Sequence, residues 1–105
     1  MIPQWVIEKK RDGGVLEADD IRAFIEGYTT GTIPDYQMAA LAMAIFFQGM
    51  TPEETAALTD AMMRSGDCLS FEGWPRPTAD KHSTGGIGDK LSMVIGPLAA
   101  SAGLA

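Results

Sequence analysis

The alternation of apolar and polar positions predicts four helices in the first 66 residues. In one of them, apolar residues recur at i, i+3, i+4 and i+7 and so share one helical face: Ile21, Phe24, Ile25 and Tyr28. Another starts at Thr51-Pro52-Glu53-Glu54, where Thr51 can cap the helix and Glu54 can complete a capping box. The predicted helices cover residues 3–11, 19–30, 34–48 and 51–65 approximately. Joined by short glycine turns, they predict a compact helical bundle over residues 1–66.

The helix predicted over residues 34–48 is apolar on nearly every side. One apolar stripe consists of Met38, Leu41, Ala42 and Ile45. The rest of the surface is also mostly apolar: Ala39, Ala40, Met43, Phe46 and Phe47. Such a helix must be covered on more than one side. We therefore expect a homodimer formed through the helical unit, the alternative being that neighbouring helices of the same chain suffice.

The pattern changes after residue 66. Residues 67–77 are rich in glycine and proline, which predicts an irregular connector. A short strand is expected over residues 78–81, followed by a glycine-rich loop. A helix should then begin at Gly88 or Asp89 and be kinked or interrupted at Gly96-Pro97.

A strand, a glycine loop and a helix form the opening of an α/β domain, which we expect over residues 78–105. The predicted fold class is therefore mainly α. A small amino-terminal helical bundle is followed by the first strand–glycine loop–helix of an incomplete α/β domain.

Composition narrows the classes of partner. The formal net charge of −6 argues against a diffuse basic face for nucleic acid. The longest apolar run, Met38 to Phe47, is about half of what a bilayer span needs. Cys68 is the only cysteine, which excludes a disulfide framework and fits a reducing compartment. We expect a cytoplasmic protein with no nucleic-acid partner and no membrane contact.

The basic triplet Lys9-Lys10-Arg11 ends the first predicted helix. Cations are favourable in a last helical turn because of the helix dipole. The triplet therefore predicts a solvated helix end, and a phosphate or membrane contact is the alternative.

The densest concentration of candidate chemistry lies in residues 80–92, which read D-K-H-S-T-G-G-I-G-D-K-L-S. Small glycines let backbone N–H groups curl around an anion. Lys81 adds a positive charge, and hydroxyl donors are added by Ser83, Thr84 and Ser92. The segment matches neither the spacing of a P-loop nor that of a dinucleotide-binding fingerprint. Its chemistry indicates an oxyanion cradle.

The same segment resembles the K-H-S-T-G-G-[IV]-G-D signature of the thymidine/pyrimidine-nucleoside phosphorylases. Upstream, three further stretches resemble the amino-terminal helical region of that family in the same order: Asp35-Tyr36-Gln37-Met38, Gly49-Met50-Thr51-Pro52-Glu53-Glu54 and Ser65-Gly66-Asp67. Complete members of the family are much longer. The chain therefore resembles an amino-terminal portion of one.

The resemblance implies a reaction and roles for individual residues. In this family, inorganic phosphate is the co-substrate and cleaves a pyrimidine nucleoside to the free base and a pentose 1-phosphate. Lys81, Ser83 and Ser92 resemble the phosphate ligands, and His82 resembles the catalytic histidine beside the base. The family also has a potassium site, at positions corresponding to Gly88 and Lys90, where lysine replaces the usual threonine. No other cofactor is implied.

Two alternatives remain open at this point. An anthranilate phosphoribosyltransferase-like protein resembles this family in fold, although its diphosphate loop has a different glycine pattern. A non-catalytic helical module that only self-associates is the other. We expect the 105 residues by themselves to be inactive, because the family's remaining base-binding and phosphate-binding residues would lie beyond Ala105.

Overall fold

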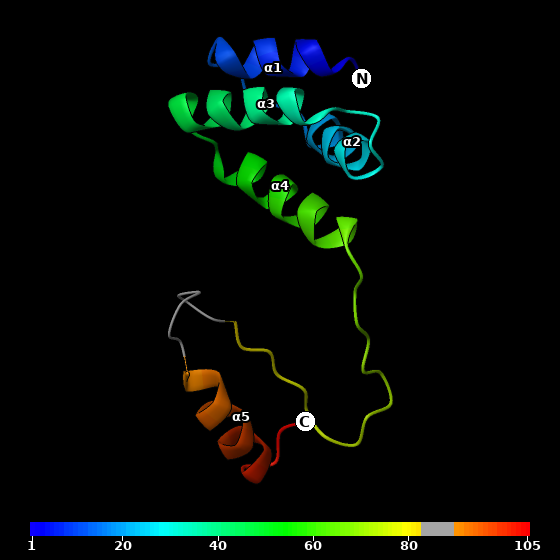
Figure 1. Ribbon diagram of the computed structural model, residues 1–105, viewed down its shortest axis with the longest axis vertical. Coiled ribbons are helices and arrows are strands. Elements are labelled where there is room, and N and C mark those ends of the chain that lie inside the picture. The colour runs from blue at the N-terminus through cyan, green and yellow to red at the C-terminus, as the bar shows by residue number, and fades with distance from the viewer. Residues whose placement is uncertain (83–89) are drawn as a thin grey trace. The chain divides into compact units, whose positions relative to one another are not determined.

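The computed structural model describes residues 1–82 and 90–105, and the chain divides into two units, Met1–Cys68 and Leu69–Ala105. The first unit contains helices α1 (Pro3–Arg11), α2 (Ala18–Thr29), α3 (Asp35–Gln48) and α4 (Pro52–Ser65). The second contains α5 (Leu91–Ser101) (Figure 1). The four helices predicted for the first 66 residues are confirmed, with ends within one or two residues of those expected.

The helical unit is built from two neighbouring pairs of helices, α1 with α3 and α2 with α4. Between them lies one core cluster, to which the helices and their connecting segments contribute Val6, Leu16, Ile21, Phe24, Ile33 and Leu41. Phe24 is fully buried, and the predicted apolar face of α2 points into this core, with only Tyr28 left at its exposed edge. Burial of these side chains is the main source of stability for helices this short.

Glycines end α1 as expected. Gly13 has a φ of 85°, a conformation that side chains with a Cβ rarely adopt. A Cβ on Gly14 would lie 2.8 Å from the backbone carbonyl oxygen of Lys9, so the chain can turn this closely only without a side chain. The turn directs the following segment back toward α4.

The start of α4 is stabilised by a side-chain cap. The Thr51 hydroxyl accepts a hydrogen bond from the backbone N–H of Glu54 at 3.1 Å. The Glu54 carboxylate in turn accepts one from the backbone N–H of Thr51 at 2.8 Å. This reciprocal pair is the predicted capping box, and it satisfies two N–H groups that would otherwise lack partners.

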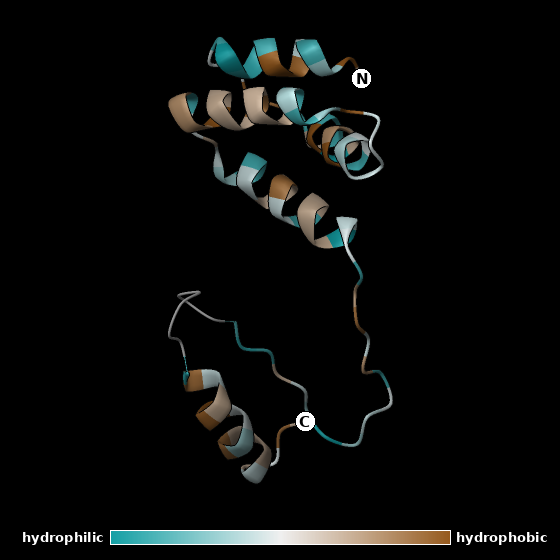
Figure 2. Cartoon of the chain, viewed as in Figure 1, coloured by the Kyte–Doolittle hydropathy of each residue, from teal (hydrophilic) through white to brown (hydrophobic). Residues whose placement is uncertain are grey.

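Helix α3 is covered on one side only within the helical unit. Leu41 and Ala44 are buried, whereas Tyr36, Phe46 and Phe47 are each more than 70 % exposed. Figure 2 shows that α3 is largely apolar after its first turn. The neighbouring helices of this unit therefore do not suffice to cover α3.

In the second unit the predicted helix is confirmed, but the predicted strand is absent. Residues 78–82 form no strand, and the part of the chain that the structure describes contains no partner strand to complete a ladder. Helix α5 begins at Leu91, after a non-helical Lys90, which is later than the expected start at Gly88 or Asp89. It continues through Gly96 and Pro97 as one helix.

In residues 1–82 and 90–105, no helix combines the length and apolar content that a membrane span requires.

Candidate phosphate site and the buried Glu54 cluster

Two of the predicted phosphate ligands lie next to each other. Lys81 follows the connector and Ser92 is the second residue of α5, eleven positions later. The Lys81 ammonium donates a hydrogen bond to the Ser92 hydroxyl, with 2.7 Å between Nζ and Oγ. Both side chains are exposed, so a small ion from solvent can reach them.

A hollow of about 450 Å³ adjoins this pair. Its walls come from the segment before Lys81, from one face of α5 and from the end of the chain. They are Ala79, Asp80, Lys81, Ser92, Ile95, Gly96, Ala99, Ala100, Leu104 and Ala105. Small side chains on α5 leave the space open, and Lys81 and Ser92 supply hydrogen-bond donors at its edge. The hollow is large enough for a phosphate ion.

The remaining predicted site residues are only partly placed. His82 is exposed and directly follows Lys81. Ser83 and Gly88 lie outside the described residues, as do Thr84 and Asp89. The structure therefore brings together Lys81 and Ser92, and His82 is the chain neighbour of Lys81.

Of the two residues predicted for the cation site, the structure describes only Lys90. Lys90 is exposed at the start of α5, and its ammonium is itself a cation. Potassium is bound by oxygen atoms, so only the backbone carbonyl of Lys90 fits a ligand role. Among the residues that the structure describes, no group of three or more His, Cys, Asp or Glu side chains could hold a metal ion.

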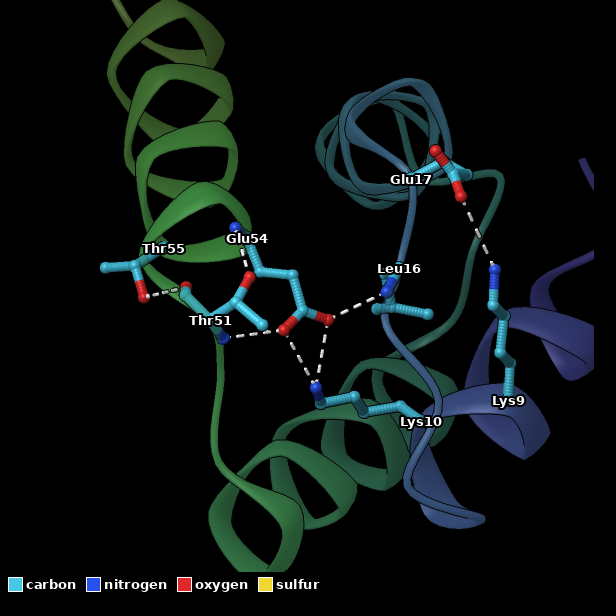
Figure 3. Close-up of polar contacts among 7 residues, drawn as sticks. All are labelled: Lys9, Lys10, Leu16, Glu17, Thr51, Glu54 and Thr55. Carbon is cyan, nitrogen blue, oxygen red and sulfur yellow. Dashed lines mark hydrogen bonds and ion pairs between the residues drawn. The ribbon is translucent and has the colours of Figure 1, made fainter.

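Among the residues that the structure describes, the most fully buried polar group lies in the helical unit. The Glu54 side chain is 1 % exposed, and that of Lys10 is 4 % exposed. The Lys10 ammonium donates to both carboxylate oxygens of Glu54, at 2.9 and 3.0 Å (Figure 3). The backbone N–H of Leu16 donates to one of these oxygens at 2.8 Å, and the N–H of Thr51 to the other. Glu54 therefore joins α1, the α1–α2 segment and the start of α4.

These contacts determine the protonation of Glu54. Burial by itself would raise the pKa of its carboxyl group, because the charged form loses water. Hydrogen bonds from the N–H groups of Leu16 and Thr51 and from Lys10 outweigh burial and lower the pKa from 4.5 to about 2. Glu54 is therefore ionised at neutral pH. Because its oxygens are engaged by protein donors, we assign it a structural role rather than a catalytic one.

The prediction of a solvated helix end holds for Lys9 and Arg11, which are exposed in the last turn of α1, but not for Lys10. Lys10 is buried against Glu54, while Lys9 lies 3.8 Å from Glu17 and Arg11 lies 2.8 Å from Asp12. The sequence does contain one signal for this arrangement. Lys10 follows the buried Val6 by four residues and so shares its helical face.

Comparison with known proteins identifies relatives of the chain. Residues 4–66 match a family described as "Glycosyl transferase family, helical bundle domain". The chain is 59 % identical over 99 residues to a pyrimidine-nucleoside phosphorylase of Geobacillus stearothermophilus, covering 94 % of the chain and 23 % of the relative. It is 52 % identical over 103 residues to a thymidine phosphorylase of Mesorhizobium japonicum, covering 98 % of the chain and 24 % of the relative. The chain spans about a quarter of the length of these curated relatives.

Proposed function

Because this chain belongs to the glycosyl transferase family through its helical bundle domain, we propose that it forms part of a pyrimidine-nucleoside phosphorylase. The observation that carries this proposal is the hydrogen bond between Lys81 and Ser92. This bond links Lys81, the first residue of the K-H-S-T-G-G-I-G-D segment, to Ser92 in helix α5, which follows the segment. The names of the two relatives support a pentosyl transfer to phosphate.

In the proposed reaction, a phosphate oxygen forms a bond to the anomeric carbon of the nucleoside. The carbon–nitrogen bond to the pyrimidine breaks, and its electron pair leaves with the base. The products are a pentose 1-phosphate and the free base. Phosphate is the nucleophile, so the protein needs to hold and orient it without forming a covalent bond to it.

Lys81 and Ser92 are suited to this task by their separation. With 2.7 Å between Nζ and Oγ, one small anion can receive hydrogen bonds from the ammonium and the hydroxyl together. Ser83 is proposed as a third ligand on the strength of the sequence resemblance. Asp80 borders the same hollow, and its negative charge would favour release of the anion over permanent retention.

His82 is proposed to act on the leaving group. An imidazole can donate a hydrogen bond or a proton to the departing pyrimidine. His82 directly follows Lys81, the proposed phosphate ligand, in the chain. Any contribution from potassium would be limited to backbone carbonyls near Lys90, and no step is assigned to it.

Phosphate binding to the 105-residue chain tests this proposal. We expect saturable changes in the amide NMR signals of Lys81, His82, Leu91 and Ser92 on titration with inorganic phosphate. Replacing Lys81 with methionine should weaken binding at least about tenfold, because a hydrogen bond to a charged group contributes about 1.5–3 kcal/mol.

The matched control for this titration is Lys9→Met, which removes the same charge from an exposed lysine of the helical unit. It should bind phosphate like the parent chain. Equal binding by Lys81→Met and the parent chain, or shifts that chloride reproduces at equal ionic strength, would rule out the phosphate site. Tighter binding of a ribose diphosphate than of phosphate would instead favour the phosphoribosyltransferase-like alternative.

The isolated 105 residues are expected to show no phosphorolysis of uridine or thymidine. The chain covers about a quarter of its relatives' length and so offers part of a site. Release of free uracil or thymine, followed by liquid chromatography, measures this directly. Turnover that depends on phosphate would show that these residues are sufficient for the chemistry.

We also propose that the protein works in the cytoplasm.

We further propose that the protein is a homodimer formed through α3. Tyr36, Met43 and Phe47 follow one another at spacings of seven and four residues and lie on the exposed side of the helix. In a two-fold symmetric dimer this face would pack against its own copy. The same contact would remove exposed aromatic surface from water.

Replacing Phe47 with arginine should dissociate this dimer. Burying one phenylalanine contributes about 1.5–3 kcal/mol, and a symmetric interface loses two copies, so the dissociation constant should rise at least about 100-fold. A positive charge near the carboxyl end of a helix interacts favourably with the helix dipole, so we expect α3 itself to remain helical. Analytical ultracentrifugation over a concentration series measures the change.

Leu69→Arg is the control for this experiment, because Leu69 is 82 % exposed and lies outside the helical bundle. It should leave the dimer intact. A parent chain that stays monomeric at high concentration would refute the homodimer. A dimer that tolerates Phe47→Arg as well as Leu69→Arg would refute the α3 interface.

A further inference from the structure

We draw no further inference here: the strongest candidate, the apolar groove of about 450 Å³ that α2, α3 and α4 form beside Ile25, Leu41 and Leu58, carries none because nothing in the structure shows what covers it.

Discussion

Replacing Glu54 with glutamine is expected to lower the free energy of unfolding of the helical unit by about 3–5 kcal/mol. Glutamine keeps the size of the side chain and one oxygen acceptor for the backbone N–H groups. It removes the charge opposite the buried Lys10 ammonium, which is then left without a counter-ion. An uncompensated buried charge is among the few single changes with so large an effect. Urea unfolding followed by circular dichroism gives the difference.

Three further variants separate the ion pair from other effects. Glu53→Gln removes an exposed carboxylate from the same first turn of α4, and its cost should stay below about 1 kcal/mol. The other two are Lys10→Met alone and Lys10→Met combined with Glu54→Gln. The double variant removes both charges, so its cost should be smaller than the sum of the two single costs. A loss for Glu54→Gln no greater than that for Glu53→Gln would show that the buried pair is not what stabilises this unit. Strict additivity in the double variant would do the same.

Acidification is expected to remove the stabilisation that the ionised Glu54 carboxylate provides, without any mutation. The pKa of Glu54 is about 2 in the folded chain, below its ordinary value of 4.5. A carboxylate with a lowered folded pKa stabilises the fold fully above its unfolded pKa. Its contribution is lost as the pH falls from about 4.5 through about 2. Since each pKa unit corresponds to about 1.4 kcal/mol, the stability lost in this window is about 3 kcal/mol.

Urea unfolding at several pH values between 2 and 7 measures this loss. The parent chain should lose more stability between pH 4.5 and pH 2 than Glu54→Gln does, because glutamine does not titrate. A direct measurement is available even if the variant unfolds. The carboxyl carbon signal of Glu54 in the parent chain should titrate with a midpoint near 2. A midpoint near 4.5 would contradict the hydrogen-bonding arrangement of Figure 3.

The candidate site was predictable in its residue types and only partly in its geometry. The order Lys81, His82, Ser83 within a glycine-rich segment indicates anion chemistry from the sequence, because few other functions need those groups together. The contact between Lys81 and Ser92 joins residues that are eleven positions apart. Sequence alone offers no rule that predicts such a contact, since the segment fits neither a P-loop nor a dinucleotide-binding loop.

The prediction of a strand over residues 78–81 was wrong for a related reason. A strand is stable only when another strand satisfies its backbone N–H and C=O groups. The local sequence can favour an extended segment, and residues 78–82 form no helix, but extension alone does not make a sheet. Whether a partner strand is present depends on residues far away in the sequence.

By itself the sequence determined the helices of the first unit and the capping box of α4. Helix periodicity, Gly13 and the Thr51–Glu54 pair act over three or four residues, so local chemistry is sufficient. Only the tertiary structure decided that Lys10 is buried. Its partner Glu54 lies 44 residues away, and the free energy of a buried charge depends on whether such a partner arrives. The exposure of Phe47 was decided in the same way, because coverage of a helix depends on which other elements fold against it.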